Sequence, residues 1–176
     1  MDQATRRHDS GAAGEDASAQ AVDARPTRAQ GCAPARPLPP VFVVEDDPAI
    51  ATLITALLNK LGLANPVEYA RDSTTAIEAL AAGLAHSRLP ILILLDLHLL
   101  HGTGFDVLRW SRDQSDLSDV PVVMLTGSAA LDEVNEAQAL GVASYLVKPV
   151  GFEALADVVR SLPTRWALLA PEHIDG

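Results

Sequence analysis

Short apolar runs alternate with amphipathic stretches along most of the chain. Five runs have the length and apolar character of strands, the second weakly, and they cover residues 41–44, 66–70, 91–95, 120–125 and 143–147. The run at 91–95 is apolar at every position. This indicates a central strand that is buried on both faces.

Apolar residues at helical spacing follow each run and predict five helices. Asp47 and Pro48 are typical of a helix N-cap followed by proline at the first helical position, and Gly62 is typical of the glycine that ends a helix. The helices are expected to begin near 48, 72 or 73, 105, 129 and 152, and those with a visible end to stop near 61, 83, 140 and 162.

Five alternations of strand and helix predict an α/β fold, a doubly wound five-stranded parallel sheet with helices on both faces. In such a sheet, ligands bind at the carboxyl ends of the strands. Asp47 is better explained as the helix cap than as a ligand. The polar residues expected at this edge of the sheet are Glu45, Asp46, Asp47, Asp96, Thr126 and Lys148.

The predicted domain covers residues 41–162, and the two flanking segments differ from it. Residues 1–40 are rich in Ala, Gly, Pro, Gln and Arg and poor in branched apolar residues, which predicts a disordered tail. A docking tail with Cys32 as a reactive thiol is the alternative. Residues 163–176 form a C-terminal tail that is expected to extend the last helix and pack on the domain through Trp166.

The net charge of −10 argues against some functions. Residues 1–40 hold five acids and five arginines, so the negative charge falls on the rest of the chain, whose only lysines are Lys60 and Lys148. Such a domain is a poor candidate for nucleic-acid binding. No apolar run approaches the roughly 18 residues of a membrane span, no signal peptide is visible, and one cysteine allows no internal disulfide. We therefore expect a cytoplasmic protein with no membrane contact.

The residues at the carboxyl edge form a chemically coherent set. Carboxylates that converge on one pocket repel each other unless a cation joins them, and oxygen ligands without His or Cys favour Mg²⁺ (or Mn²⁺). Lys148 adds a positive charge and Thr126 a hydroxyl. A carboxylate nucleophile, a divalent metal ion and a lysine are what phosphoryl transfer to an aspartate requires, because the incoming group is itself anionic.

Four short motifs resemble the receiver domain of two-component response regulators. They are the acidic motif at 43–47, the phosphoacceptor motif Leu-Leu-Asp-Leu at 94–97, the threonine motif at 122–127 and the lysine motif Tyr-Leu-Val-Lys-Pro at 145–149. Asp96 and Thr126 are 30 positions apart, and Thr126 and Lys148 are 22 apart, which suits that family. The resemblance covers residues 41–162 and implies a flavodoxin-like strand order, 2-1-3-4-5.

The resemblance implies how a metal ion is held. Asp96 is the phosphoacceptor nucleophile and, with Asp46, a direct ligand of the ion. Glu45 binds the ion through a water molecule, and His98 supplies its backbone carbonyl. Leu100 stands where the family usually has proline, a departure that is expected to touch no chemical group of the site.

The resemblance also assigns the residues around the phosphoryl group. Thr126 and Lys148 contact the phosphoryl oxygens, the bond between residues 148 and 149 is cis, and Tyr145 is the aromatic whose position reports the switch. His98 and Ser128 lie two positions after the phosphoacceptor and the threonine. Their side chains are expected to rim the pocket where water attacks and so to tune the phosphoryl lifetime.

The leading hypothesis is a stand-alone receiver that takes a phosphoryl group from a sensor histidine kinase and signals by protein–protein interaction. It is a phosphoacceptor switch that promotes its own phosphorylation and dephosphorylation, not an enzyme. The alternative is a relay intermediate that passes the phosphoryl group to a His phosphotransfer protein. A hydrolase with an aspartyl nucleophile is disfavoured, because that type usually needs a second acid where His98 stands. Stand-alone receivers of phytochrome-type kinases are similar in ending with an aromatic and aliphatic tail.

The downstream partner, or a second copy in a homodimer, is expected on the face formed by the fourth helix, the fifth strand and the fifth helix, residues 129–162. Asp132, Glu133 and Glu136 give this face an acidic rim suited to a basic partner. A contact through the Trp166 tail is the alternative route to a homodimer.

Overall fold

The computed structural model describes residues 37–127 and 130–162. In this part of the chain, strands and helices alternate as expected. The strands are β1 (Val41–Val44), β2 (Val67–Ala70), β3 (Leu92–Asp96), β4 (Val122–Thr126) and β5 (Ser144–Val147). The helices are α1 (Pro48–Lys60), α2 (Ser73–Ala85), α3 (Gly104–Arg112), α4 (Leu131–Ala139) and α5 (Phe152–Ser161).

The strands form one parallel sheet in the order β2-β1-β3-β4-β5. The doubly wound, flavodoxin-like arrangement expected from the sequence is therefore confirmed. Strand β3 lies in the middle of the sheet, and all five of its residues are buried. Val44 at the end of β1 is in register with Leu95 of β3, so the next residues, Glu45 and Asp96, lie side by side at this edge of the sheet.

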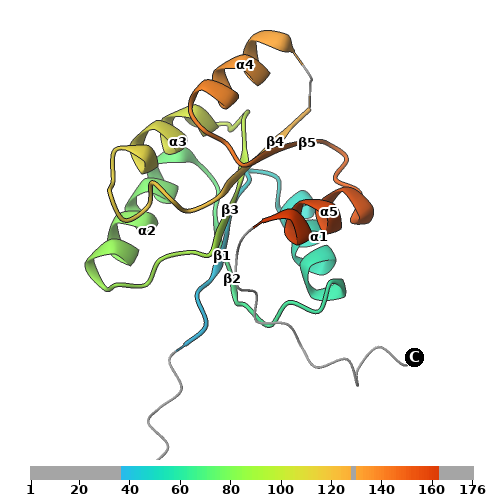
Figure 1. Cartoon of the computed structure of the whole chain (residues 1–176), viewed down its shortest axis with the longest axis horizontal. Helices are drawn as coiled ribbons and strands as arrows, with labels where there is room; N and C mark the ends of the chain where they lie inside the picture. Colours follow the sequence, from blue (N-terminus) through green and yellow to red (C-terminus); the bar gives the residue numbers. More distant parts are fainter. Residues whose placement is uncertain (1–36, 128–129, 163–176) are drawn as a thin grey trace, which may run out of the picture. The chain divides into compact units, whose positions relative to one another are not determined.

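Successive strand residues point to opposite faces of the sheet and build two separate cores. Val43, Leu94 and Leu125 belong to the core under α1 and α5, whereas their neighbours Val44 and Leu95 belong to the core under α2 and α3. Figure 1 shows α1 and α5 on one side of the sheet and α2 and α3 on the other. Because both faces are covered, the carboxyl edge of the sheet remains the place where polar side chains can gather.

Most helix boundaries follow the local signals in the sequence. Asp47 caps α1, and its Oδ1 accepts a hydrogen bond of 2.8 Å from the backbone N–H of Ala49, with Pro48 at the first helical position. Gly62 follows α1 with φ +76°. The expected end of α2 near Gly83 is wrong, because this helix continues to Ala85.

Gly83 serves a different purpose from the predicted one. The chain returns closely past it after α2, and the backbone N–H of Arg88 donates to the carbonyl of Gly83 at 2.8 Å. A Cβ at position 83 would come within 2.7 Å of the carbonyl oxygen of Arg88. The glycine therefore permits a close backbone approach inside the helix and does not end it.

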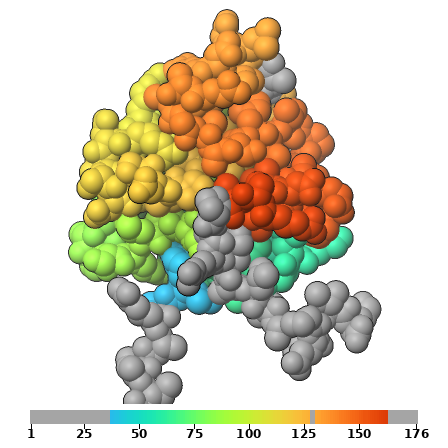
Figure 2. Space-filling view, in the orientation of Figure 1, coloured from blue at the N-terminus to red at the C-terminus, as the bar shows by residue number. Residues whose placement is uncertain are grey.

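Helix α4 buries little of its surface against the rest of the domain. Ala137 is its one buried residue, and Leu131 at its start is 78 % exposed. Its carboxyl end is held by Arg112 of α3, whose guanidinium donates to the carbonyl oxygens of Leu140 at 3.3 Å and Gly141 at 3.0 Å. In Figure 2, α4 stands as an orange ridge above the rest of the described domain.

Several expectations concern residues outside the described ranges. The tail at 1–36, Cys32 within it, Ser128 and Ala129, and the C-terminal segment with Trp166 all lie there. The expectations about the tails and the domain limits therefore stay predictions. Among the helices of the described ranges, none has the length and apolar character to cross a membrane.

Gly104 offers a test of how tightly α3 packs under the phosphoacceptor strand. A Cβ at this position would come within 2.3 Å of the carbonyl oxygen of Asp96 and 3.1 Å of Cα of Leu97, both rigid backbone atoms. We expect Gly104→Ala to lower the free energy of unfolding in urea by about 1–3 kcal/mol through overpacking. Gly151→Ala is the control, because a Cβ there meets nothing within 4 Å. Equal losses in the two variants would contradict this account.

Candidate functional site

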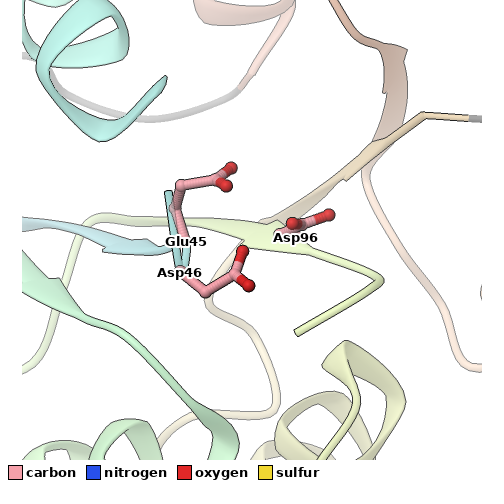
Figure 3. Close-up of side chains that lie close together, drawn as sticks. All are labelled: Glu45, Asp46 and Asp96. Atoms are coloured by element: carbon pink, nitrogen blue, oxygen red, sulfur yellow. The ribbon is translucent and has the colours of Figure 1, made fainter. Parts of the chain in front are cut away.

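The carboxyl ends of β1 and β3 bring three carboxylates together. Glu45 and Asp46 follow β1, and Asp96 is the last residue of β3. One oxygen of each lies within 4.8 Å of the others (Figure 3). The structure therefore brings these three residues together, and their roles as metal ligands stay predictions.

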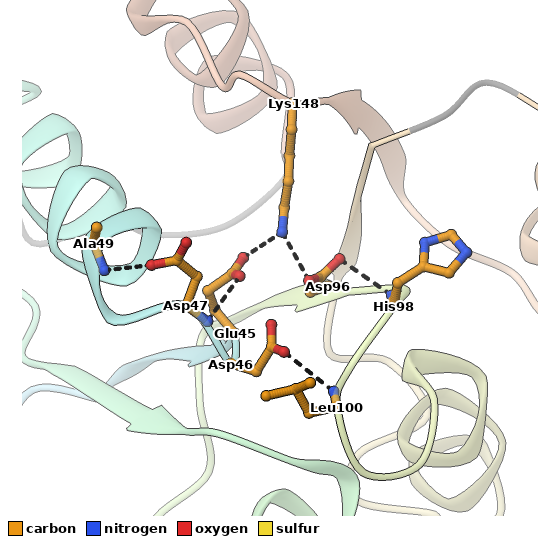
Figure 4. A network of polar contacts seen from close by, with 8 residues as sticks. All are labelled: Glu45, Asp46, Asp47, Ala49, Asp96, His98, Leu100 and Lys148. Carbon is orange, nitrogen blue, oxygen red and sulfur yellow. Dashed lines mark hydrogen bonds and ion pairs between the residues drawn. The ribbon is translucent and has the colours of Figure 1, made fainter.

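Asp47 takes no part in this cluster. Its carboxylate turns toward α1 as the helix cap, while its backbone N–H donates to Oε1 of Glu45 at 3.3 Å (Figure 4). Glu45 itself is fully buried. Of the three consecutive acids after β1, Glu45 and Asp46 therefore belong to the carboxylate cluster, whereas Asp47 caps α1.

Lys148 joins the cluster from the end of β5. Its ammonium Nζ lies 2.7 Å from Oδ2 of Asp96 and 2.7 Å from Oε2 of Glu45. The backbone N–H of Lys148 donates to the carbonyl of Thr126 at 2.7 Å, which ties the lysine to the end of β4. The peptide bond to Pro149 is cis, as the resemblance implied.

Asp96 is held at both oxygens. Oδ2 accepts a hydrogen bond from Lys148, and Oδ1 accepts one of 3.2 Å from the backbone N–H of His98. Only 4 % of its surface is exposed. These two hydrogen bonds fix the orientation of the carboxylate, which suits a nucleophile.

Lys148 compensates the acidic charge at this edge only in part. Burial raises the pKa of the Glu45 carboxyl, the neighbouring charge of Asp96 raises it further, and the contact with Lys148 only partly opposes them. Burial acts against the charge of Lys148, but its hydrogen bonds and ion pairs with Asp96 and Glu45 outweigh that effect and raise its pKa. Lys148 therefore keeps its proton at neutral pH, and its ammonium contacts two of the three clustered carboxylates, those of Asp96 and Glu45.

The residues present fit a divalent cation. The cluster offers carboxylate oxygens without sulfur or imidazole nitrogen, the ligand set that Mg²⁺ and Mn²⁺ prefer. A cation between the three carboxylates would relieve their mutual repulsion and the burial of Glu45. The role of the His98 carbonyl as a fourth ligand stays a prediction.

Leu100 contributes a chemical group to the site, contrary to expectation. Its backbone N–H donates to Oδ2 of Asp46 at 3.1 Å, while its side chain is 79 % exposed. A proline at this position has no N–H and could not make the contact. The departure from the usual residue therefore links the loop after β3 to Asp46.

Thr126 and Tyr145 lie where the sequence placed them. Thr126 is buried at the end of β4, in register with Val147 of β5. Tyr145 is half-buried and packs against the core under α2 and α3. Their roles at the phosphoryl group and in the switch stay predictions, and Ser128 lies outside the described residues.

One contact beside the site was not expected from the sequence. Nε2 of His98 lies 3.1 Å from Oε1 of Glu133 on α4, a residue that the sequence suggested only for an acidic surface rim. Glu136, assigned to the same rim, pairs with Arg109 of α3. The two positions of the first pair are 35 residues apart and share no motif, so nothing in the sequence pointed to their contact.

Comparisons with known proteins agree with this geometry. The family model described as "Response regulator receiver domain" matches residues 41–160. Chemotaxis protein CheY of Pseudomonas aeruginosa is 33 % identical over 122 residues, which are 69 % of this chain and 94 % of CheY. The solved structure of the bacteriophytochrome response regulator RtBRR is 37 % identical with a TM-score of 0.66, over 75 % of this chain and 82 % of that one.

A second similar structure carries a metal ion. It is the receiver domain of the sensor histidine kinase PA1611 from Pseudomonas aeruginosa PAO1, with a magnesium ion coordinated in the active site cleft. It is 27 % identical, with a TM-score of 0.59 over 70 % of this chain and 95 % of that one. Four motifs, the sheet order, the carboxylate cluster and these matches lead to one conclusion: the chain belongs to the response regulator receiver domain family of two-component signalling.

Proposed function

We propose that this receiver accepts a phosphoryl group on Asp96 from a histidine kinase and transmits the signal by binding another protein. The observation that carries the proposal is the position of Lys148, whose ammonium lies 2.7 Å from both Asp96 and the buried Glu45. Receiver domains are phosphoacceptor switches, and the close approach of the Lys148 ammonium, the Asp96 carboxylate and the acidic cluster supports this role for Asp96.

The chemistry follows from the contacts of Asp96. One carboxylate oxygen forms the bond to phosphorus while the bond from phosphorus to the donor's histidine nitrogen breaks, and that nitrogen keeps the electron pair. The backbone N–H of His98 orients the carboxylate, and Lys148 is placed to exchange a carboxylate contact for a phosphoryl oxygen. A divalent cation held by Asp46, Asp96 and Glu45 supplies the remaining positive charge when bound.

The signalling role rests on two further lines of support. The residue two positions after Asp96 is His98 and its ring contacts Glu133, so no second acid stands there to serve a hydrolase. The similarity to response regulators named for bacteriophytochromes makes a phytochrome-type kinase the first donor to test. We propose a stand-alone receiver; transfer onward to a His phosphotransfer protein is the competing role.

The output face is proposed from the same resemblance. Thr126 would move toward the phosphoryl group, and Tyr145 would turn inward behind it, which changes the surface of α4, β5 and α5. A ligand can shift such an equilibrium only through contacts that differ between the two states, and Thr126 lies at the strand end where they would differ. This face is where we place the downstream partner or a second copy.

Phosphorylation of Asp96 can be tested directly. After incubation with acetyl phosphate and Mg²⁺, the wild-type protein should gain the mass of one phosphoryl group, whereas Asp96→Asn should gain none because the amide is a poor nucleophile. Asp47→Asn is the matched control, since asparagine also caps helices and Asp47 faces away from the pocket. Normal uptake by Asp96→Asn would refute the assignment.

Metal binding can be tested through stability. Asp46→Asn removes one of three clustered carboxylates and keeps an oxygen that accepts from the N–H of Leu100. Without metal, its free energy of unfolding should therefore be about 1 kcal/mol higher than that of wild type. Magnesium at about 100 times its Kd should stabilise wild type by about 2.7 kcal/mol and leave Asp46→Asn almost unchanged. Glu78→Gln, an exposed charge change on α2, should respond to magnesium as wild type does. Urea unfolding with and without the metal decides the matter, and an equal magnesium response in all three proteins rules out Asp46 as a ligand.

A further inference from the structure

His98 contacts two parts of the molecule that matter for signalling. Its backbone N–H donates to Oδ1 of Asp96 at 3.2 Å, and its ring Nε2 lies 3.1 Å from Oε1 of Glu133 on α4. A carboxylate only accepts hydrogen bonds, so Nε2 carries the ring hydrogen in this contact. Figure 4 shows the ring directed away from the carboxylate of Asp96.

The position of Glu133 is fixed by how α4 is attached. Glu136 lies one turn further on the same face of α4 and pairs with Arg109 of α3. Arg112, also on α3, binds the carbonyl oxygens that close the carboxyl end of α4. With so little of α4 buried, these polar contacts help to hold the carboxylate of Glu133 beside His98.

We propose that Glu133 is a positioning residue that shortens the lifetime of the phosphoryl group on Asp96 by holding the ring of His98 clear of it. The inference rests on the proposed function, because it concerns the phosphorylated state of the same aspartate. The ring side chain is 60 % exposed and that of Glu133 is 26 % exposed, so the ring has room to take another position when the contact is lost.

Loss of the phosphoryl group is a hydrolysis whose geometry explains the effect. A water oxygen forms a bond to phosphorus on the side opposite the Asp96 oxygen, and the bond from that oxygen to phosphorus breaks. The carboxylate leaves with the electron pair, and the proton of the water goes with the inorganic phosphate or to solvent. Asp96 is only 4 % exposed, and its Oδ1 accepts a hydrogen bond from the backbone N–H of His98. A phosphoryl group on Asp96 would therefore lie beside the loop that begins at His98, and we place the approach of the water along this loop.

Once Asp96 is phosphorylated, the ring N–H of His98 can donate either to Glu133 or to the phosphoryl oxygens. Held by Glu133, it leaves the path of the water open. Without Glu133, the ring N–H is attracted to the anionic phosphoryl oxygens two residues away, and the ring then occupies the space that the attacking water needs. Removal of the carboxylate should therefore slow dephosphorylation.

The test compares lifetimes in matched variants of the full chain. The proteins are phosphorylated with acetyl phosphate and Mg²⁺, freed of the donor, and followed by the mass of the acyl phosphate over time. Glu133→Ala should lengthen the half-time of the acyl phosphate about threefold. This factor corresponds to the free energy of a partly exposed ion pair expressed as a ratio of rates. Glu133→Gln keeps an acceptor oxygen and should remain close to wild type. Asp132→Ala, an exposed neighbour with the same charge change, should equal wild type.

A double-mutant cycle identifies the route of the effect. In a His98→Ala background, Glu133→Ala should change the half-time no further, because the ring through which it acts is gone. Equal effects of Glu133→Ala with and without the ring would overturn the inference, as would an unchanged or shorter half-time in Glu133→Ala alone. Wild-type protein that takes up no phosphoryl group would instead refute the proposed function, so the two failures are distinguishable.

Discussion

The contact of one ammonium group with two carboxylates is the interaction on which this molecule is organised. Lys148 reaches Asp96 and Glu45 at 2.7 Å each, and it can do so only because three strands end at the same edge of the sheet. Burial of Glu45 has an electrostatic cost that the lysine offsets only in part. A bound metal ion can therefore supply positive charge that Lys148 alone does not.

The loop after β3 connects the acidic cluster to its surroundings. Gly104 packs against the backbone of Asp96, Leu100 donates its N–H to Asp46, and His98 donates its own to Asp96. The loop is thus bonded to two of the three acids by backbone groups, whose positions do not depend on side-chain rotamers. The ring of His98 also contacts Glu133, which links this loop to α4.

Local chemistry explains why much of this could be predicted from the sequence. Continuous apolar strands, the cap at Asp47 and the residues after each strand are signals that sit next to the feature they predict, and the parallel fold then brings the strand ends together. The predicted end of α2 at Gly83 was wrong, because the sequence does not distinguish a glycine that permits a close backbone approach from one that ends a helix. The hydrogen bond from the N–H of Leu100 could not be predicted, because nearly every residue type has a backbone N–H and the sequence does not show which ones bind a side chain.

The contact between His98 and Glu133 was beyond the sequence for a different reason. It depends on the angle at which α4 crosses the sheet, and a helix with one buried residue shows no apolar stripe from which that angle could be inferred. The acidic residues of α4 looked like a surface rim because exposure was the simplest explanation of their charge.

The shallow attachment of α4 also has a thermodynamic consequence for any protein that docks on it. Displacing a helix that buries so little sacrifices little packing energy, so modest binding energy is enough to select one of its positions. Linkage then works in both directions: a partner that binds the phosphorylated form more tightly by some factor favours phosphorylation at equilibrium by the same factor. The receiver and its target would therefore set each other's state, and the amount of target in the cell would become part of the signal.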